Sequence, residues 1–220
     1  MRKFRNILLP LFAACALTAQ AAEEDAAAAL ERGRDLFDFG RWSDAWHEFL
    51  RARAASDPAD RTTVEEIDFY LAACAVELGS ADAEGALRDF EERYPGSVYA
   101  NDVRFALGSF YCSAGNMREA REAFERTEYR ALSAPRREQY DIRMGYVEFT
   151  AGDYEAAYGH FDRIGSRSEY ADHALYYKSY IDYAEGRSGR AKQGFTQLAR
   201  SDAYRDVVPF YLMQIEFREG

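Results

Sequence analysis

The chain has 220 residues and a formal net charge of −10, from 28 basic and 38 acidic residues. A surface this acidic repels phosphate backbones and anionic lipid headgroups, so the composition excludes nucleic acid as an expected partner. The charge needs no special partner to explain it, because an acidic surface also keeps a protein soluble.

The first 21 residues have the features of a secretory signal. Three of the first five residues are basic, residues 7–17 form an apolar run, and residues 19–21 (Ala-Gln-Ala) fit a cleavage site. The apolar run is too short to span a bilayer. We therefore expect residues 1–21 to be a signal peptide, and its removal takes away three basic residues and brings the mature chain to about −13.

A second interpretation makes Cys15 a lipidation site, because residues 12–15 loosely fit a lipoprotein signal. Phe12 is a poor residue at the start of that motif, and an apolar Ala-Leu-Thr-Ala would follow the lipid. Soluble export is the favoured prediction, and association with a membrane is expected only if Cys15 is lipidated or through an envelope complex.

One spacing recurs through the rest of the chain: a small residue, then Gly seven positions later, Ala after five more, and Phe after four more. Successive copies begin 34 to 39 residues apart, a period typical of stacked helical hairpins. The four full copies are Gly33, Gly40, Ala45, Phe49; Gly108, Gly115, Ala120, Phe124; Gly145, Gly152, Ala157, Phe161; and Ser179, Gly186, Ala191, Phe195. A degenerate copy is Ala72, Gly79, Ala86, Phe90, and a sixth begins with Met213 and Gly220.

Each position of this motif has a mechanical role. The small residue midway along a first helix lets a second helix cross it closely, and the next Gly suits the left-handed residue that ends a helix. The Ala faces the same crossing from the second helix. The Phe lies one turn further along and fills the space beside the crossing.

This pattern resembles the tetratricopeptide repeat, and the resemblance covers residues 26–220. Residues 107–124 give the best copy, whereas Arg104, Asp141 and Leu175 replace the large residue often found early in the first helix. Residues 94–100 also resemble the inter-repeat linker of cell-envelope members, such as the lipoprotein of the outer-membrane barrel assembly machinery and the coordinator of envelope constriction.

The resemblance implies an all-α, right-handed solenoid of helix-turn-helix hairpins, about five and a half repeats long. We expect the array to fill residues 22–220, and no segment alternates as a strand would. The expected repeats cover residues 26–58, 64–97, 101–134, 138–171 and 172–205, followed by the first helix of a sixth at 206–219.

Aromatic side chains are the main candidates for a binding site, because the chain has 16 tyrosines and 15 phenylalanines. Certain first-helix positions line the inner curve of such an array, and rings there could hold a peptide. The alternative is that the same rings pack against neighbouring helices as core. The predicted groove residues are Phe69, Phe105, Tyr146, Phe149, Tyr176, Tyr180 and Tyr183.

The residues that carry chemistry form no recognisable catalytic, cofactor or metal motif. His47, His160 and His173 stand in no metal spacing, and no phosphate loop or nucleophile elbow is present. Cys74 and Cys112 are expected as buried small residues, although a disulfide between them is conceivable in an oxidising compartment. We expect no catalytic, cofactor or metal site.

The predicted last helix, around residues 208–217, has no second helix to cover it. A solenoid needs a polar capping element, so we expect further repeats downstream or docking onto another subunit. The sequence as a whole predicts a non-catalytic periplasmic scaffold that binds other proteins or peptides. The alternatives are a lipid-anchored subunit of an outer-membrane machine and a regulatory domain of a longer protein.

Overall fold

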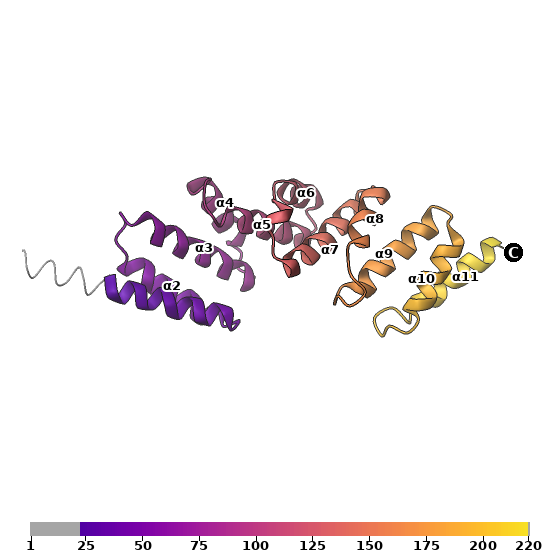
Figure 1. The fold of residues 1–220 in the computed structure, drawn as a ribbon, viewed down its shortest axis with the longest axis horizontal. Helices are drawn as coiled ribbons and strands as arrows, with labels where there is room; N and C mark the ends of the chain where they lie inside the picture. The colour runs from indigo at the N-terminus through magenta and orange to yellow at the C-terminus, as the bar shows by residue number, and fades with distance from the viewer. Residues whose placement is uncertain (1–22, 220) are drawn as a thin grey trace, which may run out of the picture. The chain divides into compact units, whose positions relative to one another are not determined.

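The computed structural model describes residues 23–219, and all the regular elements in that range are helices (Figure 1). The signal segment predicted at residues 1–21, with Cys15, lies outside the described residues. The chain divides into two compact units, an N-terminal unit up to residue 106 and a C-terminal unit from residue 107. No helix between residues 23 and 219 is both long and apolar enough to cross a bilayer.

The N-terminal unit is built from paired helices around a small apolar core. A first helix covers residues 23–38 and is followed by α2 (Trp42–Ala55), α3 (Arg61–Glu77), α4 (Ala83–Arg93) and the first half of α5 (Ala100–Ala114). Leu30, Phe49 and Ile67 come from three successive helices and pack together in this core. These contacts hold one hairpin against the next.

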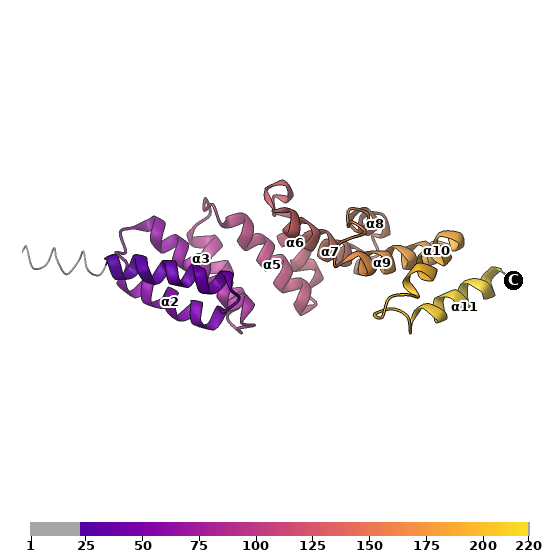
Figure 2. The ribbon, with the colours of Figure 1, turned by 60° about the horizontal axis from the view of Figure 1, so that its bottom comes forward.

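The C-terminal unit continues the same alternation of longer and shorter helices. Its elements after α5 are α6 (Met117–Glu125), the 3₁₀ turn η1 (Tyr129–Ala131), α7 (Ala134–Thr150), α8 (Tyr154–Asp162), α9 (Ala171–Ala184), α10 (Ser188–Leu198) and α11 (Val208–Glu219). Each helix from α7 to α11 packs on the next, and Figure 2 shows α9, α10 and α11 lying side by side. The predicted all-α, tetratricopeptide-like repeat fold is confirmed.

The turn inside each hairpin ends on a glycine with positive φ, as the motif predicts. At Gly152, φ is +80°, its N–H donates to the Phe149 carbonyl at 3.1 Å, and the N–H of Asp153 donates to the Glu148 carbonyl at 3.0 Å. This pair of bonds is the Schellman ending of a helix. The same arrangement recurs at Gly40, Gly79, Gly115 and Gly186.

The close crossings predicted at the small residues are also confirmed. A Cβ added to Gly145 on α7 would lie 2.6 Å from Cε1 of Phe161 on α8. Gly33 and Gly108 stand in the same relation to Phe49 and Phe124, at 2.5 Å. The facing alanines of the four full copies are completely buried: Ala45, Ala120, Ala157 and Ala191. Glycine is therefore required because a ring occupies the place of its missing side chain.

The crossing of α9 and α10 is built differently. The first helix carries Ser179, whose hydroxyl donates to the Leu175 carbonyl at 2.7 Å. Here the glycine is on the second helix, since a Cβ on Gly194 would lie 2.0 Å from the Ser179 Oγ. The neighbouring Phe195 stacks on Tyr211 of α11, with ring centroids 4.6 Å apart and planes 1° apart.

Candidate interaction surface

Aromatic side chains from α7 and α9 form one continuous group in the C-terminal unit. Phe149 on α7 lies at its centre, with its ring centroid 4.9 Å from that of Tyr177 and 5.3 Å from that of Tyr180, both on α9. Tyr146, one turn before Phe149, lies 5.7 Å from Tyr177. Tyr154, at the start of α8, also packs against Phe149, with ring centroids 5.6 Å apart.

The group continues from α9 to α11. Tyr176 stacks on Tyr204 at 4.8 Å, and its hydroxyl lies 3.2 Å from the hydroxyl of Tyr211. Tyr183 lies 5.7 Å from Tyr211 and carries the Arg218 guanidinium 4.2 Å above its ring centroid. We call the whole set the aromatic surface: Tyr146, Phe149, Tyr154, Tyr176, Tyr177, Tyr180, Tyr183, Tyr204 and Tyr211.

Every ring of the aromatic surface is half-buried. The rings pack against one another where successive first helices meet, and each keeps part of its area accessible. The contacts among the rings agree with the core interpretation, and the groove interpretation stays a prediction. Half-buried tyrosines present an apolar face together with a polar hydroxyl, which is the combination enriched where proteins bind proteins.

The phenol groups of Tyr177, Tyr180, Tyr204 and Tyr211 remain neutral at physiological pH. Burial raises the pKa of Tyr177 and Tyr180, and it raises the pKa of Tyr204 to about 12. Burial, followed by the hydrogen bond with Tyr176, also raises the pKa of Tyr211. Neutral phenols both donate and accept hydrogen bonds, so they can pair with the backbone of a bound chain.

Two of the predicted groove residues lie in the N-terminal unit. Phe69 on α3 is half-buried and stacks on Tyr99, with ring centroids 4.3 Å apart and planes 12° apart. Phe105 on α5 is only 5 % exposed, so its ring fills the interior rather than lining a surface. The structure therefore brings together five of the seven predicted residues, all of them in the C-terminal unit.

Tyr177 and Tyr211, which are not among the predicted groove residues, connect the aromatic surface to the buried phenylalanines of the hairpins. Each follows the motif phenylalanine, Phe161 or Phe195, by 16 residues in the sequence. Tyr177 stacks on Phe161 at 5.0 Å with planes 12° apart, and Tyr211 stacks on Phe195 in the same way. The spacing of 16 residues was visible and could have identified both.

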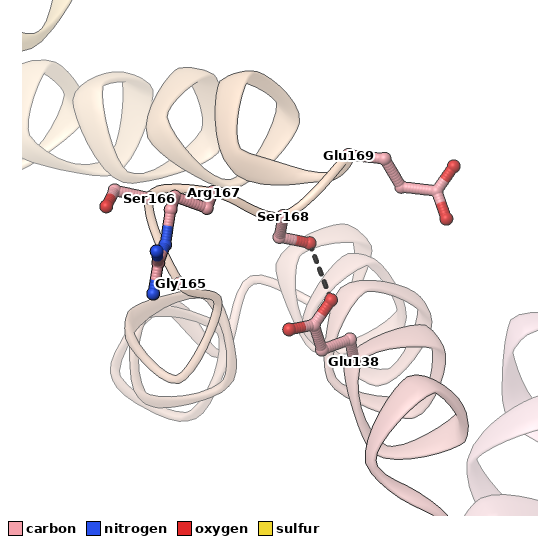
Figure 3. A pocket seen from close by; sticks show the side chains of 6 residues that line it. All are labelled: Glu138, Gly165, Ser166, Arg167, Ser168 and Glu169. Atoms are coloured by element: carbon pink, nitrogen blue, oxygen red, sulfur yellow. Dashed lines mark hydrogen bonds between the residues drawn. The ribbon is translucent and has the colours of Figure 1, made fainter.

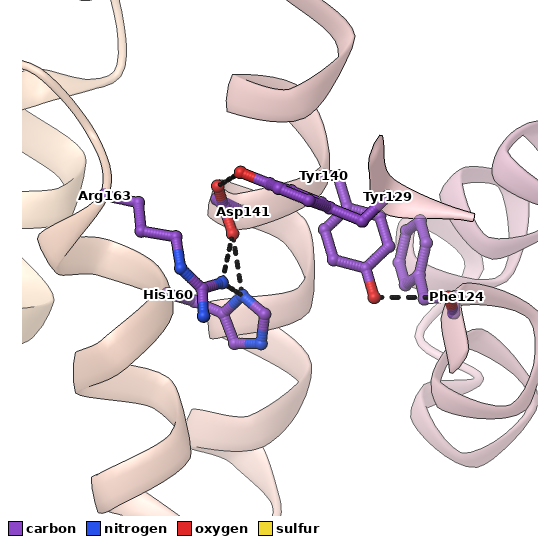
Figure 4. Close-up of polar contacts among 6 residues, drawn as sticks. All are labelled: Phe124, Tyr129, Tyr140, Asp141, His160 and Arg163. Atoms are coloured by element: carbon purple, nitrogen blue, oxygen red, sulfur yellow. Dashed lines mark hydrogen bonds and ion pairs between the residues drawn. The ribbon is translucent and has the colours of Figure 1, made fainter. Parts of the chain in front are cut away.

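A polar cluster lies between α7 and the end of α8, beside their apolar crossing (Figure 4). The buried Asp141 carboxylate accepts a hydrogen bond from the Tyr129 hydroxyl at 2.6 Å and one from Arg163 at 2.9 Å, and it lies 2.8 Å from His160 Nδ1. Burial by itself would raise the pKa of Asp141, but the bonds from His160, Tyr129 and Arg163 outweigh it and hold that pKa below its ordinary value.

An ionised Asp141 accepts hydrogen bonds only, so its contact with His160 is a hydrogen bond in the tautomer that carries the proton on Nδ1. The carboxylate then has three donors and a lowered pKa, which leaves it poorly suited to accept a proton from a substrate. This explains the aspartate at a position where the repeat usually has a large residue: the polar partners come from η1 and from the end of α8. We interpret the cluster as structural.

A second buried carboxylate, that of Glu148, lies further along α7. Glu148 forms an ion pair with Arg121 of α6. Burial raises the pKa of Glu148, and the nearby Arg121 only partly offsets that effect. Asp182, at the equivalent place on α9, pairs with Arg187 at 2.5 Å. Each of the two acids is paired with an arginine, which indicates a structural role for them too.

An open, polar pocket of about 520 Å³ lies beside the loop between α8 and α9 (Figure 3). The Ser168 hydroxyl donates to the Glu138 carboxylate at 2.7 Å, and the Glu169 side chain points away from the others. Its lining has few apolar atoms and brings no set of polar groups to one point, so it lacks the features of a cofactor or substrate pocket.

The potential metal and redox residues have no arrangement that suggests chemistry. Within residues 23–219, no group of three or more His, Cys, Asp or Glu side chains is placed to hold a metal ion. Cys74 and Cys112 are both free thiols. Burial raises the pKa of the Cys74 thiol to about 12 and also raises that of Cys112, so neither is an activated nucleophile.

The sequence matches no protein-family model and no curated protein. The fold, however, is similar to the crystal structure of a tetratricopeptide repeat protein from Parabacteroides merdae ATCC 43184, with a TM-score of 0.62. The similarity covers 88 % of this chain and 73 % of that chain, at 13 % sequence identity. At that identity the likeness concerns the fold, and it agrees with the predicted repeat architecture.

Proposed function

We propose that this chain is a non-catalytic scaffold that holds a protein or peptide partner along the aromatic surface. The observation that supports this most strongly is the continuous group of half-buried rings contributed by α7, α9 and α11. Such rings supply large contact area with little loss of conformational freedom, and their hydroxyl groups can bond to the backbone of a partner.

The proposed scaffold works in the periplasm or at the periplasmic face of the outer membrane. The basic start, apolar run and Ala-Gln-Ala site within residues 1–21 support export. Cys15 supports a second candidate, a lipid-anchored subunit of an outer-membrane assembly machine. Both candidates use the same aromatic surface and differ only in how the chain is held in the envelope.

Site-specific photo-crosslinking tests the binding proposal. A benzophenone amino acid in place of Tyr146 should crosslink a defined partner in envelope fractions. The same amino acid in place of Phe39, which is 83 % exposed in the N-terminal unit, should not crosslink that partner. Equal crosslinking from both positions, or none from Tyr146, would contradict the proposal.

Fractionation and mass spectrometry of the mature N-terminus test the location. We expect an unmodified chain that begins after Ala21 and is recovered with periplasmic proteins. A diacylglycerol on Cys15 would favour the lipid-anchored alternative, and an uncleaved cytoplasmic chain would contradict both.

A further inference from the structure

Four rings where α7 meets α9 form the centre of the aromatic surface. Phe149 contacts Tyr177 and Tyr180, with ring centroids 4.9 and 5.3 Å apart, and Tyr146 contacts Tyr177 at 5.7 Å. We call these four residues the α7–α9 rings. All four are half-buried, so each ring keeps an accessible part. The groups around them restrict the kind of segment that they can bind.

The charged side chains of α7 and α9 are engaged elsewhere. Those beyond the first turn of each helix are all bonded to residues outside the aromatic surface: Glu138, Asp141, Arg143, Glu148, Lys178 and Asp182. A charged group of a ligand would therefore lose its water against the α7–α9 rings without gaining an opposite charge from either helix. This arrangement favours an uncharged segment.

Two phenol hydroxyls of the α7–α9 rings have no partner in the described part of the chain. Among residues 23–219, no hydrogen bond involves the hydroxyl of Tyr146 or Tyr180, and no side-chain oxygen is both buried and unbonded. Both hydroxyls therefore reach solvent. A phenol hydroxyl can donate to a carbonyl oxygen, so a ligand that offers carbonyl oxygens free of its own hydrogen bonds would fit them best.

Backbone conformation decides whether a ligand offers such carbonyls. An α-helix bonds its carbonyls internally, and a β-strand carries N–H groups that need acceptors as well. A polyproline II segment has no internal hydrogen bonds, and each proline contributes a carbonyl but no N–H. Grooves lined by aromatic side chains bind such segments because their conformation is fixed before binding, so little entropy is lost.

The period of polyproline II also fits the spacing of the helices. It has three residues per turn and rises about 3.1 Å per residue, so every third residue recurs after about 9 Å. The axes of packed helices lie about 8–10 Å apart, and α7 and α9 are in contact. In a segment that crosses both helices, one proline can lie on Tyr146 and Phe149 of α7 while the proline three residues away lies on Tyr180 of α9.

We propose that the partner held on the aromatic surface presents an uncharged, proline-rich segment in the polyproline II conformation. This inference rests on the proposed function and names the chemical class of its ligand. Prolines three residues apart pack on the rings of α7 and α9, and backbone carbonyls accept hydrogen bonds from Tyr146 and Tyr180. A second copy of the chain cannot supply the segment, because its five prolines, at positions 10, 58, 95, 135 and 209, are far apart.

Calorimetric titration with synthetic peptides tests the proposal without knowledge of the natural partner. The probe repeats Pro-Pro-Ser over about 12 residues, long enough to cross both helices, and its ends are acetylated and amidated so that it carries no charge. One comparison peptide replaces every proline with alanine, and another replaces every serine with lysine. A third is an uncharged amphipathic helix of the same length.

We expect the proline peptide to bind, and each comparison peptide to bind at least about tenfold more weakly. Its affinity should change by less than about twofold between low and physiological salt, because no ion pair forms. Tyr146→Phe/Tyr180→Phe keeps both rings and removes both hydroxyls, so it should weaken binding about tenfold. Tyr158→Phe is the matched control, since it removes the hydroxyl of a half-buried tyrosine on α8 outside the aromatic surface, and it should bind as the wild type does.

Four results would overturn the proposal. They are equal binding of the proline and alanine peptides, tighter binding of the helix or of the lysine peptide, equal binding by the two phenylalanine variants, and no binding of the proline peptide. Circular dichroism of both variants verifies that the fold is kept. Photo-crosslinking at Tyr146 separates this inference from the proposed function. A partner still captured there by a protein that ignores the proline peptide would overturn only the inference, whereas failure of both experiments would overturn both.

Discussion

Two helix crossings, α7 with α8 and α9 with α10, reach the same close approach through different residues. In the first, Gly145 on the first helix makes room for Phe161 on the second. In the second, Ser179 on the first helix is accommodated by Gly194 on the second. The close approach is kept although the glycine has changed helix, which teaches that the constraint belongs to the pair of helices and not to one sequence position.

The same two crossings distinguish the side chains that hold the hairpins together from those that remain accessible to a partner. Phe161 and Phe195 are completely buried and bind each hairpin to the next first helix through Tyr177 and Tyr211. Tyr146 and Tyr180 contact Tyr177 and Tyr211, respectively, and are half-buried. We expect changes to the first set to cost stability and changes to the second set mainly to cost binding.

Phe161→Ala should have the largest effect, because it removes a completely buried ring and leaves a cavity beside Gly145 and Tyr177. We expect the free energy of unfolding to fall by about 3–5 kcal/mol, measured by urea denaturation. Phe217→Ala on α11 is the matched control, with an expected change within about 0.5 kcal/mol because its ring is exposed. Equal losses would show that the buried ring is not the main attachment.

Gly145→Ala should destabilise the protein by about 1–3 kcal/mol, because the new Cβ collides with the completely buried Phe161 ring. Gly159→Ala, on the exposed side of α8, places a Cβ with no heavy atom within 4 Å. That change should be neutral or stabilise by up to about 1 kcal/mol through helix propensity. Equal effects of Gly145→Ala and Gly159→Ala on the free energy of unfolding would mean that α7 and α8 can move apart without loss of stability.

Gly194→Ala should cost about 1–2 kcal/mol, since its Cβ collides with the Ser179 hydroxyl. The double variant Ser179→Gly/Gly194→Ala moves the glycine back to the first helix and should recover most of that loss. A double-mutant cycle from urea unfolding should give a coupling energy of at least about 1 kcal/mol. Additive effects would mean that the two positions do not share one crossing.

Asp141→Asn should cost about 1–3 kcal/mol at pH 7, because it weakens hydrogen bonds to a buried charge. The folded-state pKa of Asp141 lies below its ordinary value. Its contribution is therefore complete above the unfolded pKa, about 4, and is lost as the pH falls through the lowered folded pKa. Urea titrations at pH 7 and below pH 4 should show the difference between wild type and variant shrinking in acid. A difference that grows in acid would contradict this assignment.

The features predicted from the sequence are those set by residues close together in the chain. The turn glycines, from Gly40 to Gly186, and the meeting of Gly33, Gly108 and Gly145 with their phenylalanines are confirmed because a fixed spacing on a helical hairpin determines them. The sequence also placed five residues of the aromatic surface on adjacent first helices, and the structure brings those five together.

The remaining features depend on contacts between hairpins or on irregular segments. Asp141 looked like a departure from the repeat because its partners Tyr129, His160 and Arg163 lie 12 to 22 residues away, one of them in a 3₁₀ turn that no pattern predicts. Phe105 follows the same first-helix spacing as Phe69 but is buried, which depends on its neighbours in three dimensions. The spacing alone cannot distinguish the buried Phe105 from the half-buried Phe69.

Calorimetric titration of the partner captured at Tyr146 tests the central claim most directly. The account predicts that Tyr146→Ala/Tyr180→Ala weakens binding at least about tenfold. It also predicts that this variant keeps its helical circular dichroism and a cooperative urea transition. Unchanged affinity in the folded variant would show that the partner is held elsewhere and that the aromatic surface only joins one hairpin to the next.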